Sequence, residues 1–260
     1  MPSFGICTPI ENAPAVKAAG WEYVEEVVVN FIQGRVPDEQ WKGLERLARS
    51  PLPVPAANVL VPAQLKITGP EADLDALRRY MQTVLARARQ VGITILVFGS
   101  GGARNVPEGF DRDKARGQII DFVRMSADLA AGHGITLVAE HLNRRECNII
   151  NTIPEAMEYV RAVNHPHFQC LADSYHFWLE DEPPDNLRAA MPWIRHVHVA
   201  DSEGRVPPGE SGKNDYQSFF RVLKEAGYDG GITVEALNWT DIAERGPRVL
   251  EFLTTQWEQA

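Results

Sequence analysis

The sequence predicts an α/β protein that forms a single-domain (β/α)8 (TIM) barrel over residues 1–260. Short runs rich in β-branched residues alternate with segments of helical period along the whole chain. About eight strands and eight helices in 260 residues match the size and rhythm of this fold. A doubly wound sheet is the alternative, but its first strand is usually followed by a Gly-rich turn, and here that turn reads CTPIENAP.

Each expected strand is a short apolar run. The eight runs cover residues 3–7, 22–29, 53–58, 93–99, 135–141, 168–173, 194–200 and 231–236. The clearest helices are predicted at 71–91 and about 112–131, where apolar side chains recur at helical spacing. Thr68 and Glu71 are spaced like a capping box, which places the start of the first of these helices near residue 71.

Three strands begin with the tripeptide Gly-Ile-Thr, at Gly92, Gly134 and Gly231. Each follows a predicted helix, and a glycine in the left-handed conformation can end a helix at such a position. The pattern predicts one βα module used repeatedly, without a strict sequence repeat.

Composition excludes several classes of function. The net charge of −9 argues against a nucleic-acid partner, which requires a basic face. No apolar run approaches the ~20 residues needed to span a bilayer, so no membrane partner is expected. The N-terminal segment lacks the features of a signal peptide, which favours the cytoplasm. The three cysteines show no CxxC spacing and are expected to be small buried residues.

The last four predicted strands each carry an ionisable side chain at the C-terminal end. Catalytic residues of (β/α)8 barrels lie at these strand ends. The four side chains are Glu140, Asp173, His198 and Glu235. Singly, an acid here is more often a helix cap, as Asp173 before Ser174 would be, and a lone histidine is more often a core residue. Together, on neighbouring strands ~4.8 Å apart, they can converge on one ion.

Three carboxylates and one imidazole suit a hard or borderline divalent cation. Mn²⁺ is the expected metal, with Mg²⁺, Co²⁺ and Zn²⁺ as alternatives. His196 lies two residues before His198, so we expect it on the same strand face one layer deeper, behind the metal site or in the core.

A second set of polar residues follows these strands: Glu146, His176 and Arg205. Singly, each is expected to be a solvated loop residue, but together they offer donors and acceptors to a polyhydroxy substrate above the metal. The segment FGSGGAR (98–104) lacks phosphate-loop spacing, and we interpret it as a turn that passes close to a ligand. Arg104 within it is expected to be a solvated arginine.

Four motifs carry a resemblance to a known family: VAEHLNRRE, LADSYH, HVHVADSEGRVPPGESG and ITVEA. They resemble the xylose-isomerase-like barrels, in particular the sugar-phosphate isomerase/epimerase group that includes D-tagatose 3-epimerase and hydroxypyruvate isomerase. The resemblance implies a metal held by Glu140, Asp173, His198 and Glu235. It also implies substrate contacts from Glu146, His176 and Arg205 and a small-molecule sugar substrate. Barrels of this kind often pair through their helices, so a homo-oligomer is a candidate assembly.

The expected chemistry is proton transfer next to a carbonyl group, with Glu140 and Glu235 as the acid/base pair and a metal-stabilised enediolate. The alternative is a metal-dependent dehydratase or lyase that acts on an inositol or keto sugar. It would use the same enolising chemistry, and the sequence does little to distinguish it from an isomerase or epimerase. An endonuclease-IV-like phosphodiesterase would need more histidines to hold several metals and a basic face to bind DNA. The sequence has only seven histidines and a net charge of −9, which disfavours this class. A barrel that binds sugar without catalysis would not need carboxylates on both sides of the substrate, so Glu140 and Glu235 argue against this alternative.

Overall fold

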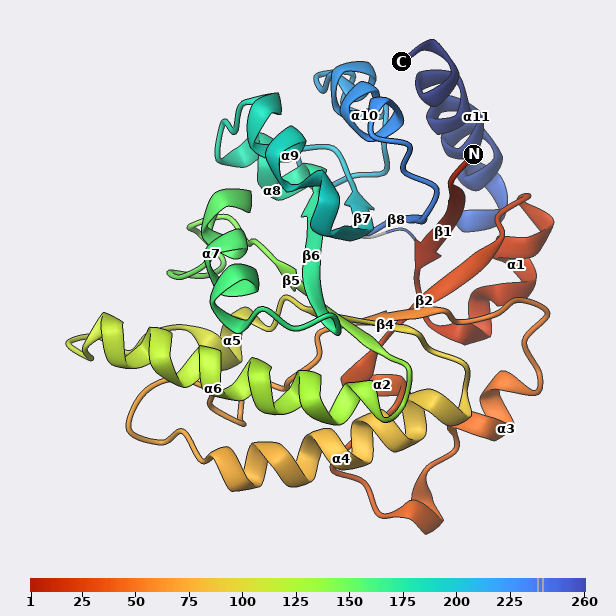
Figure 1. Ribbon diagram of the computed structural model, residues 1–260. Helices are drawn as coiled ribbons and strands as arrows, with labels where there is room; N and C mark the ends of the chain where they lie inside the picture. Colours follow the sequence, from red (N-terminus) through yellow and green to blue (C-terminus); the bar gives the residue numbers. More distant parts are fainter. Residues whose placement is uncertain (238, 240) are drawn as a thin grey trace.

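The strands close into a barrel in chain order. The computed structural model describes residues 1–237, 239 and 241–260, and in this part of the chain eight parallel strands pair from β1 to β8, with β1 also pairing with β8 (Figure 1). Their bounds are β1 Ser3–Cys7, β2 Tyr23–Val27, β3 Ala56–Asn58, β4 Ile95–Phe98, β5 Thr136–Glu140, β6 Phe168–Asp173, β7 Ile194–Val199 and β8 Gly231–Val234. The predicted (β/α)8 barrel is therefore confirmed.

Helices surround the barrel and bury its outer face (Figure 1). They are α1 Ala13–Ala18, α2 Val28–Phe31, α3 Gly43–Leu47, α4 Leu74–Gln90, α5 Gly101–Arg104, α6 Arg112–Ala131, α7 Ile153–Val163, α8 Ser174–Leu179, α9 Pro184–Ala190, α10 Tyr216–Glu225 and α11 Ile242–Gln259. Short 3₁₀ turns occupy Ile10–Asn12, Asp38–Gln40 and Met191–Trp193. The last helix, α11, lies against α1 beside the N-terminus, and Trp21 Nε1 donates to the carbonyl of Gly246 there (3.2 Å).

The start of α4 differs from the prediction. The helix begins at Leu74, and its cap is Asp73, whose carboxylate accepts from the backbone N–H groups of Asp75 and Ala76. The Thr68 hydroxyl instead donates to the carbonyl of Asn105 (2.6 Å) and so fastens the loop after α5. The capping-box prediction is wrong because this hydroxyl is already used in a tertiary contact, whereas α6 has the predicted bounds.

The Gly-Ile-Thr prediction holds at two of its three positions. Gly92 and Gly134 have φ of +81° and +68°, the left-handed conformation expected after a helix. Gly231 is instead the first residue of β8, and Gly227, with φ of +73°, follows α10. Five residues, 226–230, thus separate the end of α10 from the start of β8.

The interior of the barrel has an apolar part and a polar part. β4, β5 and β6 contribute the small apolar cluster of Val97, Val138 and Leu171. β2, β7 and β8 contribute buried polar side chains, listed here as Tyr23, Glu25, His196, His198 and Thr233. The ring of Tyr23 fits only because residue 5 is glycine, since a Cβ there would lie 2.2 Å from the ring.

We expect Gly5→Ala to destabilise the barrel by roughly 1–3 kcal/mol, because the added methyl group overpacks the lumen against Tyr23. Urea unfolding followed by circular dichroism measures this change. Gly117→Ala is the matched control, because a Cβ at Gly117 in α6 meets nothing within 4 Å. Equal unfolding midpoints for Gly5→Ala and the unmodified protein would contradict the prediction.

Candidate metal centre and active site

The structure brings the four predicted metal ligands together at the C-terminal ends of the strands. One ligand atom from each of Glu140, Asp173, His198 and Glu235 lies within 4.8 Å of the others. His198 Nδ1 is 3.0 Å from Glu140 Oε1, 3.3 Å from Glu235 Oε2 and 3.9 Å from Asp173 Oδ2. Strand register contributes directly, because His198 lies opposite Asp173 on β6 and opposite Thr233 on β8.

Asp173 serves both as a helix cap and as a member of the cluster. Its Oδ1 accepts from the backbone N–H groups of Tyr175 (2.7 Å) and His176 (3.3 Å), which caps α8. Its Oδ2 faces His198. The two interpretations that the sequence left open are compatible, because a carboxylate has two oxygens and the cap uses one.

The electrostatics of the cluster fit a divalent cation. Burial raises the pKa of Glu140, and it raises the pKa of Asp173 to about 6; the neighbouring charge of Glu235 adds to both shifts. Burial also opposes ionisation of Glu235, but the charges of Arg205 and His198 outweigh it and lower its pKa to about 2. The nearby cationic groups do not balance the negative charge of these three clustered carboxylates. A dication with oxygen and imidazole ligands would supply the missing positive charge.

Glu25 is a member of the site that the sequence did not identify. This carboxylate on β2 is fully buried, and its two oxygens contact His198 Nε2 (2.9 Å) and His196 Nε2 (2.7 Å). The available signal was the pair Glu25-Glu26 inside a predicted strand, since alternation points one of the two into the barrel. Glu26 points outward and accepts from the backbone of Ile10.

His196 lies below His198, as expected from its place two residues earlier on the same strand. Its ring is buried between Glu25 and Thr233, and Thr233 Oγ1 is 3.1 Å from His196 Nε2. The neighbouring strand β8 runs beside it, with Gly231 opposite His196 in the register.

Arg205 and Glu146, from the predicted substrate-binding set, meet above the cluster. Arg205 pairs with Glu235 (2.6 Å) and approaches Glu146 (3.5 Å), and its guanidinium lies over the ring of Tyr175, 4.7 Å from the centroid. Glu146 also accepts from the side chain of Asn143 (2.9 Å). Arg205 is therefore not a solvated loop residue, whereas Glu146 is exposed and is held by its contacts with Arg205 and Asn143.

His176, the third member, is buried beside the cluster with a defined tautomer. Its Nδ1 accepts from the backbone N–H of Asn143 (3.0 Å), so the ring proton is carried by Nε2. Nε2 lies 3.8 Å from Asp173 Oδ2 and has no hydrogen-bond partner among the described residues. An unpartnered buried donor beside the cluster is a feature expected of a group that contacts a ligand.

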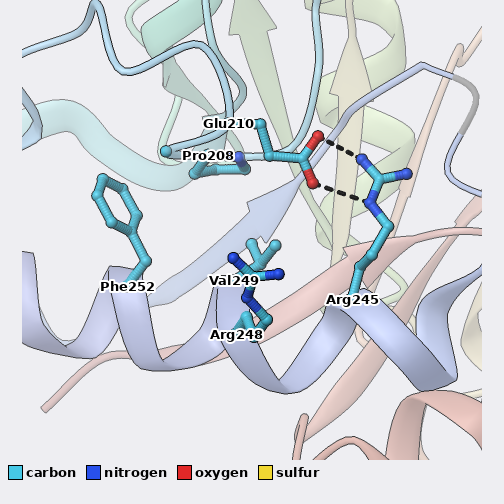
Figure 2. A pocket seen from close by; sticks show the side chains of 7 residues that line it. Pro208, Glu210, Arg245, Arg248, Val249 and Phe252 are labelled. Carbon is cyan, nitrogen blue, oxygen red and sulfur yellow. Dashed lines mark hydrogen bonds and ion pairs between the residues drawn. The ribbon is translucent and has the colours of Figure 1, made fainter.

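The loop after β7, which carries Arg205, is held at several points. Asp201 is buried and accepts from the backbone N–H groups of Gly209 (3.0 Å) and Ser211 (2.7 Å). Glu210 forms an ion pair with Arg245 of α11, shown by the dashed lines in Figure 2. The loop is thereby fastened to the helical layer, and Arg205 is held over Glu235.

A pocket of about 490 Å³ lies between this loop and α11, and Figure 2 shows the side chains that line it. It is lined by Pro208, Gly209, Glu210, Arg245, Arg248, Val249 and Phe252. None of the four clustered residues reaches it, so this pocket is not the candidate active site.

A smaller cavity, about 200 Å³, opens directly onto the cluster. It is lined by Asn58, Val59, Val61, Ala63, Gly99, Ser100, Gly101, Gly102, Glu140, Leu142, Glu146, Arg205 and Glu235. The glycine turn after β4 thus passes along the cavity, in agreement with the interpretation of FGSGGAR. At Gly99 a Cβ would lie 2.0 Å from Glu140 Oε2, so glycine is needed for this carboxylate to take its place.

Arg104, in the same turn, was expected to be solvated, and that expectation is wrong. The side chain is fully buried, and it donates to the carbonyls of Phe98 (2.7 Å) and Glu140 (2.7 Å). It therefore ties the ends of β4 and β5 together from outside the barrel. The reason is that a buried guanidinium must find acceptors, and these strand-end carbonyls provide them.

The chain belongs to the xylose isomerase-like TIM barrel family, whose model matches residues 13–253. It is 28% identical over 263 aligned residues to the L-ribulose-5-phosphate 3-epimerase UlaE of Salmonella paratyphi C, covering 90% of this chain and 84% of that protein. It is 30% identical over 132 residues to the ketose 3-epimerase of Arthrobacter globiformis, covering 50% and 45%.

The fold agrees with solved structures of this family. The 3-keto-D-glucoside 4-epimerase YcjR from E. coli superposes with a TM-score of 0.81 at 23% identity, over 98% of this chain and 100% of that one. The match spans less than two thirds of the length of several curated relatives, with shares of 64%, 48%, 45% and 42%. Across the described residues, no helix combines the length and apolar character required to cross a membrane.

Gly99→Ala is expected to weaken dication binding without unfolding the protein, because the methyl group would displace the Glu140 carboxylate. The loss should be on the order of tenfold or more, as for other groups that orient a metal ligand. Isothermal titration with Mn²⁺ measures it. The control is Gly132→Ala, where a Cβ meets only an ordinary contact at 3.5 Å. Unchanged Mn²⁺ affinity in Gly99→Ala would show that Glu140 is not a ligand.

Proposed function

We propose that this chain is a divalent-metal-dependent isomerase or epimerase of a small keto sugar or hydroxy-ketone. The observation that carries the proposal is the convergence of Glu140, Asp173, His198 and Glu235 within 4.8 Å beside a cavity that Glu140 and Glu235 both line. Family membership and epimerase relatives support the same reaction class. The four residues would hold the metal, with Mn²⁺ as the first choice.

The reaction begins at a carbon next to a carbonyl group, whose proton is too weakly acidic to leave unaided at neutral pH. When bound, the dication supplies positive charge that stabilises negative charge developing on the substrate oxygens. Glu235 and Glu140 project into the cavity from β8 and β5, and one carboxylate removes the proton from the carbon. Return of a proton by the other carboxylate to the opposite face gives an epimer, and return to the adjacent carbon gives an isomer.

Two further side chains stabilise the developing oxyanion. Arg205 already lies against Glu235, and its guanidinium donors can turn toward a substrate oxygen held there. His176 carries its proton on Nε2, the nitrogen left without a protein partner. Glu146, which approaches Arg205, accepts hydrogen bonds from substrate hydroxyl groups.

We expect solvent deuterium to appear in the substrate when the protein and Mn²⁺ are incubated in D₂O with a panel of ketoses, ketose phosphates and hydroxypyruvate. Label at C3 indicates a 3-epimerase, and label at C1 or C2 an aldose–ketose isomerase. Loss of water would instead support the dehydratase alternative. Mass spectrometry and NMR locate the label, and its absence from every compound of the panel would contradict the proposed function.

Glu235→Gln and Glu140→Gln are each expected to lower turnover by about 10²–10⁴-fold, the usual effect of removing a general acid or base. Because both residues are also proposed ligands, turnover is compared only at Mn²⁺ concentrations that saturate each variant. Full turnover by metal-loaded Glu235→Gln would show that the two-carboxylate mechanism is wrong.

The charge of the cavity predicts a preference for neutral substrates. Among its described lining residues Arg205 is the only cation, and it already pairs with Glu235, while Glu140 and Glu146 add negative charge. With the dication in place, Glu146 is the lining carboxylate left without a proposed metal contact, and a phosphate group near it would meet a like charge with no free cation among the described lining residues to offset it. We therefore expect kcat/KM for D-ribulose to exceed that for D-ribulose 5-phosphate by about tenfold or more.

Lys66 provides the control for this prediction, because its ammonium group donates to the carbonyl of Gly102 (2.9 Å), a residue that lines the cavity. The neutral-substrate prediction expects Lys66→Ala to leave the ratio of the two kcat/KM values unchanged. A preference for the phosphorylated ketose that disappears in Lys66→Ala would contradict it.

A further inference from the structure

A continuous chain of buried polar groups lies in the barrel lumen beneath the candidate metal centre. Tyr23 Oη contacts Thr233 Oγ1 (2.9 Å), and Thr233 Oγ1 contacts His196 Nε2 (3.1 Å). His196 Nε2 contacts Glu25 Oε2 (2.7 Å), and Glu25 Oε1 contacts His198 Nε2 (2.9 Å). The chain therefore ends on the ring of the proposed metal ligand.

Glu25 is the only carboxylate in this hydrogen-bond network, and two imidazoles face it. Its side chain is fully buried, and the hydrogen bonds described for its oxygens come from His198 and His196. A carboxylate accepts hydrogen bonds only, so the nitrogens that face it must carry protons.

This arrangement determines which nitrogen of His198 is available to a metal. Nε2 faces Glu25 and donates to it, whereas Nδ1 faces Glu140 and Glu235. A neutral imidazole carries one proton, so donation from Nε2 leaves a lone pair on Nδ1. Carboxylates that hold the second ring nitrogen of a ligating histidine fix its tautomer and orientation in many metal sites.

We propose that Glu25 is a positioning residue that holds His198 in the Nε2–H form and thereby prepares Nδ1 to bind the metal; this inference rests on the proposed function. Glutamine cannot replace it. An amide oxygen accepts from one imidazole, but the amide NH₂ then points a donor at the Nε2–H of the other. The clash is relieved when one of the two rings carries its proton on Nδ1 instead, and in His198 that proton points at the metal position.

The packing around the chain supports a positioning role. Gly5 leaves space for the Tyr23 ring, and a Cβ at Gly231 would lie 2.8 Å from Tyr23 Oη and 3.2 Å from the ring of His196. The two glycines let Tyr23 and His196 fill the lumen below Glu25, so the carboxylate is supported from beneath.

The same atoms allow one competing interpretation. Glu25, His196 and His198 lie within 4.8 Å of one another and offer three ligand atoms for a second ion. His196 Nε2, however, also contacts the Thr233 hydroxyl, and that contact belongs to a hydrogen-bond chain. The competing interpretation requires two bound ions, so the stoichiometry of metal binding separates the two.

The test compares Glu25→Gln with Thr233→Val, a control in the same buried layer that leaves the Glu25–His198 contact in place. Mn²⁺ affinity and stoichiometry are measured by electron paramagnetic resonance titration, and metal-free stability by thermal unfolding. We expect Glu25→Gln to bind one Mn²⁺ with 10–100-fold lower affinity. Thr233→Val should bind one ion with unchanged affinity, even where its stability falls.

A second measurement uses the unmodified protein and does not depend on the variants folding. In the Zn²⁺-loaded protein, ¹H–¹⁵N correlation spectra should show His198 protonated at Nε2 and coordinated through Nδ1. Protonation at Nδ1 would overturn the inference.

The outcomes separate this inference from the proposed function. Equal Mn²⁺ affinities in Glu25→Gln and the unmodified protein would overturn the role of Glu25 and leave the proposed function intact. Two ions in the unmodified protein and one in Glu25→Gln would assign a second metal site instead. Failure of the unmodified protein to bind any dication would overturn the proposed function, and this inference with it.

Discussion

The rest of the site depends on the contacts that the His198 imidazole makes with the surrounding carboxylates. The ring lies between Glu25 on one side and the carboxylates of Glu140, Asp173 and Glu235 on the other, and each of its nitrogens faces acid. Four carboxylates around one buried ring repel one another, and the arrangement is stable only if positive charge between them offsets this repulsion. In the metal-free protein His198 itself carries much of that charge, because these acids outweigh its burial and raise its pKa well above the usual value.

The surrounding structure keeps the acids in place despite their repulsion. Glu235 is held by Asn58 (2.5 Å) and Arg205 (2.6 Å), and Asp173 is held by the first turn of α8. The backbone also contributes. Val59, Ser100 and Arg205 all line the cavity, and all have positive φ, at +50°, +30° and +49°. For a β-branched residue such as Val59 this is an unfavourable conformation, and strain of this kind is concentrated at functional sites.

Much of this arrangement could be predicted from the sequence, because chemistry in a barrel sits where strands end. Glu140 and Asp173 are the last residues of β5 and β6, so reading the ends of apolar runs was enough to find them. Glu25 lies in the middle of β2, and the pair Glu25-Glu26 does not reveal which acid points inward. That choice depends on how β2 is registered against β1 and β3, a three-dimensional property.

The sequence predictions that proved wrong also failed because tertiary contacts cannot be read from local sequence. The Thr68 hydroxyl, the Arg104 guanidinium and Gly231 were assigned roles from their immediate neighbours in sequence. Each instead has a partner that is distant along the chain. Thr68 and Arg104 donate to the carbonyls of Asn105 and Glu140, and Gly231 is paired within the sheet opposite Ser3 and His196. Local pattern predicts an element well and predicts poorly which partner a polar group finds, because tertiary contacts decide that.

The division between strands and loops suggests how reaction and substrate are specified separately. The proposed ligands and proton-transfer groups belong to strands or directly follow them, where the sheet fixes their separation within the rigid barrel. Arg205 and Glu146 lie on loops, and the Arg205 loop depends on Asp201 and on the Glu210–Arg245 pair for its position. Changes in these loops can alter which oxygens of a substrate are held without moving the acids that transfer its proton. In the proposed function, the barrel would therefore determine the class of chemistry, and the loop geometry would determine which hydroxy-ketone reaches it.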